Sequence, residues 1–139
     1  MHMAEEPATM QDHPRYEDVV DEVVVFLRQR LEDCLEAGIP RARILLDPGF
    51  GFGKTAAHNY ALLAQLQDII GIGQPVLAGL SRKSMIAAEI HRNMDRRLPA
   101  SLALATLAAS KGARILRVHD VRETVDALAM VAATERYAR

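Results

Sequence analysis

The chain has 139 residues, enough for one domain with a real core, and its 50% hydrophobic and 25% charged residues are typical of a globular protein. A formal net charge of −1 gives no reason to expect nucleic acid or an anionic membrane as a partner, and no stretch approaches the roughly 20 apolar residues that span a bilayer. The single cysteine, Cys34, excludes an internal disulfide framework, and the first residues lack the layout of a signal peptide. We therefore expect a cytoplasmic protein.

The first predicted element is an amphipathic helix over residues 14–37. Pro14 suits a first helical turn, and Gly38 and Pro40 end the pattern. Cys34 falls on the apolar stripe of this helix, so we expect it in the core. The stripe keeps a spacing of three or four residues through Val20, Val23, Leu27, Leu31 and Leu35.

Two short apolar runs follow, one on each side of a second helix. Residues 44–46 are too few for a helix and are predicted to form a buried strand, followed by a glycine-rich turn over residues 48–54. Leucines and isoleucines at helical spacing predict a helix that reaches Ile70 and ends at Gly71. Residues 76–79 form the second predicted strand.

The last third of the chain repeats this alternation. A short helix follows Ser84, a polar loop covers residues 91–97, and a third helix runs from Pro99 to Lys111. Residues 115–118 form a third predicted strand. Asp120 and Glu123 resemble a capping box that opens a last helix to about residue 136, with an apolar stripe of Val121, Val125, Leu128 and Ala132.

Apolar strands that alternate with helices indicate a parallel sheet covered by helices. Two α/β architectures fit this order of elements, a doubly wound sheet and a slice of a (β/α)₈ barrel. A whole barrel takes about 250 residues, so this chain can supply only about half of one.

Polar side chains stand at the end of each predicted strand. Asp47 follows the first strand, residues 81–84 follow the second, and Arg117 and His119 close the third. The carboxyl ends of parallel strands share one edge, where α/β proteins bind ligands, so Asp47, Lys83, Arg117 and His119 are expected to converge. A carboxylate there can accept two N–H bonds from an amino-heterocycle, and the cations, with Ser84 at a helix start, form an anion site.

The glycine-rich turn is not a nucleotide-binding P-loop, because Pro48 occupies the position where that motif needs glycine. Phe50 and Phe52 are costly in a loop unless they cover something, and Phe52 is placed to pack against a ring. His58, at a helix start, is expected to cap or pack. His2 and His91 are expected at the surface, and no spacing of histidine, cysteine or carboxylate residues makes a metal site.

Three motifs in order resemble those of the dihydropteroate synthase family. The run from Asp47 to Lys54, with His58-Asn59 after it, is similar to the motif of the sixth barrel strand in that family. Leu80 to Ile86 resembles the seventh-strand motif, and Arg117 to Val121 resembles the eighth. Residues 1–3, then Pro7 and Thr9-Met10-Gln11, resemble the end of the fifth strand and the loop after it.

The resemblance implies a (β/α)₈ (TIM) barrel that condenses 7,8-dihydropterin-6-methyl pyrophosphate with p-aminobenzoate, using Mg²⁺. Asp47 would then bind the pterin, and Lys83 would contact the pterin and border the aminobenzoate. Arg117 would stack on the pterin and bind pyrophosphate with His119. Ser84 would hold the carboxylate of p-aminobenzoate, and Phe52 would border that pocket.

The same resemblance implies that residues 1–139 form only the C-terminal part of the barrel, about strands 6–8 with their helices and the end of strand 5. The Mg²⁺ ligand would lie in the absent N-terminal half, and the family suggests a homodimer. The loop after the fifth strand begins Ala4-Glu5-Glu6, where the family usually has glycine. Three readings remain open: a synthase completed by the missing half, an inactive fragment that binds pterin or anions, and a pterin-dependent methyltransferase relative.

Overall fold

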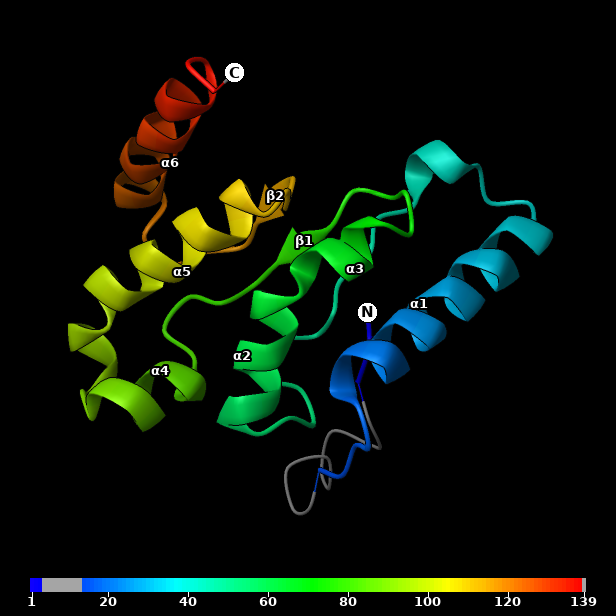
Figure 1. Ribbon diagram of the computed structural model, residues 1–139, viewed down its shortest axis with the longest axis horizontal. Coiled ribbons are helices and arrows are strands. Elements are labelled where there is room, and N and C mark those ends of the chain that lie inside the picture. The colour runs from blue at the N-terminus through cyan, green and yellow to red at the C-terminus, as the bar shows by residue number, and fades with distance from the viewer. Residues whose placement is uncertain (4–13, 139) are drawn as a thin grey trace.

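The computed structural model describes residues 1–3 and 14–138, and Figure 1 shows how their elements are arranged. The helices are α1 (Val19–Glu36), α2 (Ala56–Ala64), α3 (Leu66–Ile70), α4 (Ser84–Ile90), α5 (Leu98–Ser110) and α6 (Val121–Glu135). The strands are β1 (Leu77–Ala78) and β2 (Ile115–Leu116), and two 3₁₀ turns are η1 (Arg41–Arg43) and η2 (Met94–Arg96). Pro7 and Thr9-Met10-Gln11, with the loop expected there, lie outside the described residues.

The sheet is parallel, as predicted, but its regular pairing is shorter than the apolar runs. β1 pairs with β2 in the register Leu77 with Ile115 and Ala78 with Leu116. The run 44–46 joins them through one parallel bridge, in which Leu46 donates to the Pro75 carbonyl at 2.9 Å and accepts from the Leu77 N–H at 2.8 Å. On the other side, the His2 N–H donates to the Asp47 carbonyl at 2.9 Å. Four chain segments therefore lie side by side.

Helix α1 begins at Val19, and the prediction that Pro14 lies in its first turn is wrong. The carboxylate of Asp18 accepts hydrogen bonds from the N–H groups of Val20 at 2.8 Å and Asp21 at 3.0 Å. This cap satisfies donors that the first turn leaves open, so the helix starts directly after Asp18. The predicted stripe is otherwise right through Leu31, whereas Cys34 and Leu35 are only half-buried.

The second predicted helix is two helices, α2 and α3, because Gln65 leaves helical geometry at φ −107° and ψ 29°. α2 opens with a capping box, in which the His58 N–H donates to Thr55 Oγ1 at 3.2 Å and the Thr55 N–H donates to His58 Nδ1 at 3.3 Å. The capping role expected of His58 is thus confirmed.

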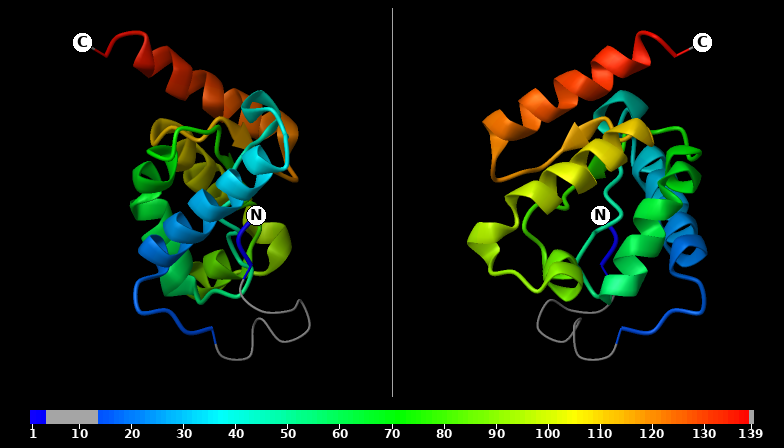
Figure 2. Two further views of the ribbon diagram at one scale, coloured as in Figure 1. Left: turned by 90° about the vertical axis from the view of Figure 1, so that its right-hand side faces the viewer. Right: turned by 60° about the vertical axis from the view of Figure 1, so that its left-hand side comes forward.

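The core lies between the strands and helices α1 to α5. α1 packs on α2 and α3, and α2 packs on α4, as the views in Figures 1 and 2 also show. The largest fully buried hydrophobic side chains of the core are Val23, Leu27, Phe50, Leu62, Leu66, Ile69, Val76, Met85 and Ile86. This core fixes the strand ends, and therefore the turns that carry the polar residues.

Helix α6 contacts α5 and stands at the end of the molecule away from α1 (Figure 1). Its predicted stripe is not a buried face: Val121 and Val125 are 61% and 58% exposed, and Thr124 is its one buried residue. The capping box is also wrong, since Asp120 makes no side-chain cap and pairs instead with Arg82. A charge-assisted pair of hydrogen bonds to a guanidinium is stronger than a bond to a neutral N–H group.

Among the helices of the described residues, none is long and apolar enough to cross a membrane.

Candidate functional site

The site begins at the carboxyl end of the run 44–46, where Asp47 is buried with 8% of its surface exposed. Its Oδ1 accepts a 2.7 Å hydrogen bond from the Gly49 N–H, which shapes the start of the glycine-rich turn. Its Oδ2 lies 4.0 Å from Arg117 Nη2. The Asp47 carboxylate thus joins the ends of the first and third strands, because Oδ1 binds the glycine-rich turn and Oδ2 faces Arg117.

Lys83 comes from the turn between β1 and α4 and crosses to the glycine-rich turn. Its Nζ donates to the Phe50 carbonyl and lies 4.6 Å from the centroid of the Phe52 ring, a cation–π arrangement. Burial first, and then the charge of Arg117, lower the pKa of Lys83 to about 8, although Asp47 acts in the opposite direction. This ammonium therefore loses its proton far more readily than an exposed lysine.

Two glycines give these cations room. A Cβ on Gly79 would lie 3.0 Å from Arg117 Nη2, and a Cβ on Gly51 would lie 3.0 Å from Lys83 Cδ. Such distances are tighter than side chains normally tolerate, so glycine at these positions lets the cations approach the backbone. Beside them a cavity of about 160 Å³ is lined by Gly79, Ser81, Lys83, Arg117, Val118 and His119.

His119 is held by the hydroxyl of Ser81. The backbone N–H of His119 donates to Ser81 Oγ at 3.3 Å, and its Nδ1 lies 3.0 Å from the same oxygen. In one of the two tautomers of His119 the Ser81 hydroxyl donates its proton to Nδ1. In that tautomer the ring proton lies on Nε2, which can donate to a ligand.

Ser84 is the first residue of α4, directly after Lys83, and it is exposed. Its side chain makes no hydrogen bond to the described residues, and it is not among the residues that line the cavity of about 160 Å³. The structure therefore brings together Asp47, Phe52, Lys83 and Arg117, joins His119 to them through Ser81, and leaves Ser84 beside them.

No pattern in the sequence indicated how the glycine-rich turn is supported. Lys54 is 4% exposed, and its Nζ lies 2.9 Å from His2 Nδ1 while donating to the carbonyls of Gly49 at 3.1 Å and Phe52 at 2.9 Å. Burial lowers the pKa of Lys54 to about 8, and burial followed by the charge of Lys54 lowers the pKa of His2 to about 4. The expectation that His2 lies at the surface is wrong.

Two further residues of the motif are structural. Phe50, expected in the loop to cover something, is 1% exposed and belongs to the core. Asn59 is 2% exposed, and its Oδ1 accepts from the Gly51 N–H at 2.7 Å while its Nδ2 donates to the Thr55 carbonyl at 2.7 Å. The backbone of the turn is thereby fixed to α2. Their place in the motif was the only sign of these roles in the sequence.

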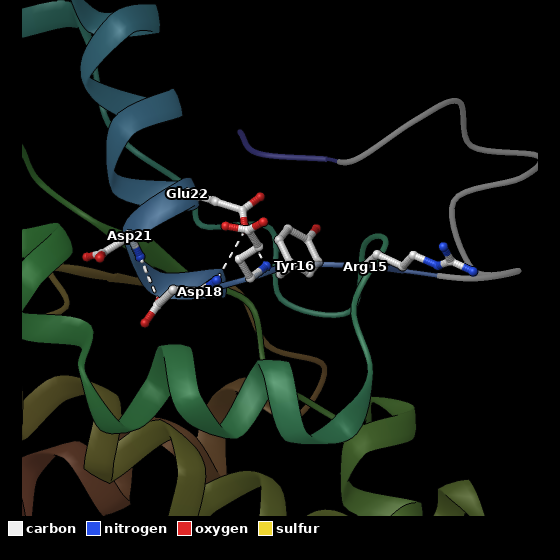
Figure 3. Close-up of a pocket in the computed structure, with 6 residues that line it drawn as sticks. Arg15, Tyr16, Asp18, Asp21 and Glu22 are labelled. Atoms are coloured by element: carbon white, nitrogen blue, oxygen red, sulfur yellow. Dashed lines mark hydrogen bonds between the residues drawn. The ribbon is translucent and has the colours of Figure 1, made fainter.

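A larger hollow, about 720 Å³, lies at the start of α1 (Figure 3). Its lining residues are Arg15, Tyr16, Glu17, Asp18, Asp21 and Glu22. Four of the six are acidic, and Glu22 Oε1 already accepts the N–H groups of Glu17 at 2.8 Å and Asp18 at 3.3 Å. These carboxylates organise a helix start and would repel an anion, so the smaller cationic cavity is the candidate site.

The pterin binding enzyme family matches residues 1–119 of this chain. The chain belongs to that family. It is 52% identical over 134 residues to a dihydropteroate synthase of Haemophilus influenzae and 49% identical over 134 residues to one of Escherichia coli. These matches cover 96% of the chain but 49% and 48% of the two relatives, so the chain spans about half their length.

Solved structures of dihydropteroate synthases also match this chain. A Yersinia pestis dihydropteroate synthase in a sulfonamide drug complex matches with a TM-score of 0.95 at 44% identity, over 99% of this chain and 50% of that one. A Stenotrophomonas maltophilia dihydropteroate synthase with imidazole in its active site matches with a TM-score of 0.96 at 47% identity, over 99% and 52%. The fold is accordingly part of a (β/α)₈ barrel, and the doubly wound alternative is excluded.

Proposed function

We propose that this chain carries the C-terminal, substrate-binding part of a dihydropteroate synthase. The reaction joins 7,8-dihydropterin-6-methyl pyrophosphate to p-aminobenzoate and yields 7,8-dihydropteroate and pyrophosphate, a step of folate biosynthesis. The observation that carries the proposal is the meeting of a buried carboxylate, Asp47, with the cations Lys83 and Arg117 at one edge of the sheet. Relatives have been solved with such ligands: Thermus thermophilus enzymes with 6HMPPP and with 4-aminobenzoate, and a Xanthomonas albilineans enzyme with 7,8-dihydropteroate.

In this proposal Asp47 binds the amino-pyrimidine edge of the pterin. Its carboxylate is buried, which strengthens hydrogen bonds to a flat N–H edge. Arg117 is 57% exposed in its side chain and is free to stack its planar guanidinium on the pterin ring. Lys83, from the turn after the neighbouring strand β1, contacts the pterin and borders the p-aminobenzoate pocket.

The anionic groups would be held by the remaining residues. Arg117 and the Nε2–H of His119 bind the pyrophosphate, and the Lys83 ammonium supplies a second positive charge nearby. Ser84 and the open N–H groups of the first turn of α4 hold the carboxylate of p-aminobenzoate. Phe52, stacked against Lys83, forms the wall beside that aromatic ring.

The chemical step is a displacement at the pterin methylene carbon. The bond from that carbon to the pyrophosphate oxygen breaks, and its electron pair leaves with pyrophosphate. The amino nitrogen of p-aminobenzoate forms the new bond to carbon and releases one proton to water. Arg117, Lys83 and His119 lower the barrier by stabilising the charge that develops on the leaving group, while the aromatic pocket holds the amine close to the carbon.

Mg²⁺ is part of the proposal only as a family property. In residues 1–3 and 14–138, no group of three histidine, cysteine or carboxylate side chains is placed to hold a metal ion. The residues present therefore do not form a Mg²⁺ site by themselves, and every step above is assigned to side chains of this chain alone. The residue proposed to bind Mg²⁺ belongs to the half of the barrel that residues 1–139 do not include.

The family resemblance also supports two smaller proposals, a cytoplasmic location and assembly as a homodimer. A pterin-dependent methyltransferase is not favoured, because the relatives at 52% and 49% identity are dihydropteroate synthases. Light scattering of the purified chain would measure its oligomeric state, and a monomer at micromolar concentration would contradict the homodimer.

Calorimetric titration of the purified chain with 7,8-dihydropterin-6-methyl pyrophosphate tests the function directly. We expect saturable binding at one site per chain, followed by formation of labelled dihydropteroate when labelled p-aminobenzoate and the N-terminal half of the Haemophilus influenzae relative are added. A folded chain that binds neither the pterin pyrophosphate nor p-aminobenzoate would refute the proposal.

The affinity for inorganic pyrophosphate is expected to fall about tenfold between about pH 7 and about pH 9. Lys83, with its pKa lowered to about 8, is charged below that pH and neutral above it, so the anion site loses a charge as the pH rises. Calorimetry across this range gives the profile. In Lys83→Arg the guanidinium stays charged, so the fall should vanish. Ionisation of the ligand is common to both proteins, and identical profiles would contradict the role of Lys83.

A further inference from the structure

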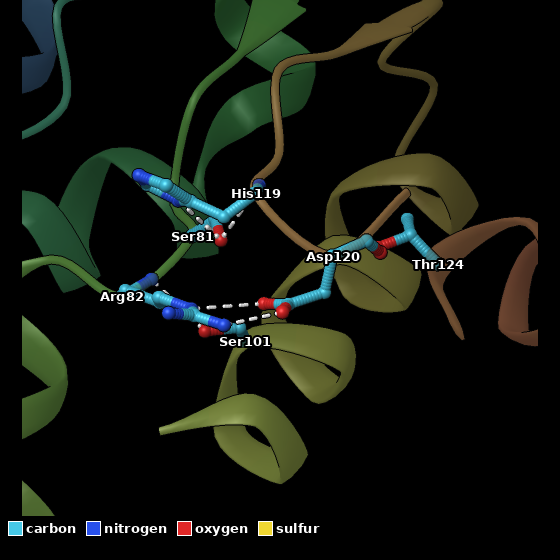
Figure 4. A network of polar contacts seen from close by, with 6 residues as sticks. All are labelled: Ser81, Arg82, Ser101, His119, Asp120 and Thr124. Carbon is cyan, nitrogen blue, oxygen red and sulfur yellow. Dashed lines mark hydrogen bonds and ion pairs between the residues drawn. The ribbon is translucent and has the colours of Figure 1, made fainter. Parts of the chain in front are cut away.

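Two turns of the site are joined residue by residue (Figure 4). In the turn after β1, Ser81 bonds to His119 and its neighbour Arg82 bonds to Asp120, the neighbour of His119. Arg82 Nε donates to Asp120 Oδ2 at 3.0 Å, and Arg82 Nη2 donates to Oδ1. Two adjacent residues of the turn after β1 therefore hold two adjacent residues of the turn after β2. Lys83 is the next residue of the turn after β1.

The backbone of Arg82 is fixed as firmly as its side chain. Its φ of 57° lies in the left-handed region, which is uncommon for a residue with a side chain. Its N–H donates to Ser101 Oγ of α5 at 2.9 Å, and its carbonyl accepts from Arg97 Nη1 at 2.9 Å. Since this conformation costs free energy, the surrounding bonds must hold it in place.

The Arg82–Asp120 pair does not belong to the ligand cavity itself. The cavity lining includes Ser81, Lys83 and His119, the neighbours of the pair, but neither Arg82 nor Asp120. The hydrogen bond from Arg82 lowers the pKa of the Asp120 carboxyl, and the same bond raises the pKa of Arg82, so both groups are ionised near neutral pH. The Arg82 guanidinium is directed at Asp120, which neutralises its charge within the protein.

We propose that Arg82 and Asp120 are positioning residues that fix Lys83 relative to Arg117 and His119 by locking the turn after β1 to the turn after β2. This inference rests on the proposed function for its purpose, but the geometry it describes exists without any ligand. Without the lock, Lys83 would leave the cationic neighbourhood of Arg117 and its bond to the Phe50 carbonyl, and the anion site would lose its shape.

The test measures the ionisation of Lys83 in the free protein. The chain has lysine only at positions 54, 83 and 111, so ¹³Cε-lysine labelling gives a simple NMR spectrum, assigned with Lys83→Arg. We compare Asp120→Asn and Arg82→Met with matched changes of exposed residues on α6, Asp126→Asn and Arg122→Met. Arg82→Lys keeps the positive charge but can bind the Asp120 carboxylate through only one nitrogen atom.

In Asp120→Asn and Arg82→Met the titration midpoint of Lys83 is expected to move from about 8 toward its ordinary 10.5, with Lys111 unchanged. In Arg82→Lys the titration midpoint of Lys83 should lie between that of these two variants and that of the parent. A general loss of stability would not produce such an intermediate midpoint. Pyrophosphate affinity should fall at least about tenfold in the same two variants and in neither control. An unmoved Lys83 midpoint in folded Asp120→Asn and Arg82→Met would overturn the proposal. Failure of the parent to bind pyrophosphate would count against the function, while the titration still decides on the lock.

Discussion

Asp47→Asn is expected to weaken binding of the pterin pyrophosphate by about 100-fold. Each hydrogen bond from the pterin to a buried carboxylate contributes about 1.5–3 kcal/mol, and about 1.4 kcal/mol corresponds to a factor of ten in affinity. Asparagine keeps the Oδ1 acceptor for the Gly49 N–H, so the turn retains its shape. Its amide group nevertheless turns a donor toward the donor edge of the pterin. Calorimetry of the variant beside the parent gives the ratio.

Inorganic pyrophosphate separates loss of the pterin contact from loss of the fold. Asp47 Oδ2 lies 4.0 Å from Arg117 Nη2, so removing its negative charge should leave pyrophosphate binding equal or tighter. Asp68→Asn, a change of an exposed carboxylate on α3, should leave both affinities as they are. If Asp47→Asn weakened both ligands equally, its assigned contact with the pterin would be wrong.

Phe50→Ala is expected to lower the free energy of unfolding by about 3–5 kcal/mol, the range for a buried phenylalanine. Phe50 is 1% exposed among the core side chains, so its removal leaves a cavity. Phe52, two residues later in the same turn, is half-buried and stacked on Lys83. Phe52→Ala should therefore cost stability far less and weaken binding of p-aminobenzoate instead.

Denaturant unfolding monitored by circular dichroism measures the two stabilities, and competition with p-aminobenzoate measures the binding. The pair serves as its own matched control, because both variants make the same chemical change in one turn. Equal losses of stability would mean that Phe52 also belongs to the core and has no surface to offer a ligand. A stable Phe50→Ala protein would contradict the packing described above.

The sequence by itself determined the order of helices and strands and the polar residue at each strand end. Apolar runs such as 44–46 and 76–79 are local signals, because a short apolar run between glycine and proline is too short for a helix. The sequence did not show that only Leu46 of the first run is buried, while Leu45 is 45% exposed. Parallel pairing then places Asp47, Lys83 and Arg117 on one edge, whatever the details of packing. These parts of the fold needed only neighbouring residues and one topological rule.

The tertiary structure alone decided which partners the polar residues take. His2 and Lys54 are 52 residues apart in the chain, and only folding places them 2.9 Å from one another beneath the glycine-rich turn. Asp120 has the local pattern of a helix cap, yet the guanidinium of Arg82, 38 residues earlier, takes its carboxylate. A charged partner that folding brings near outcompetes a local N–H group, and no spacing in the sequence records that competition.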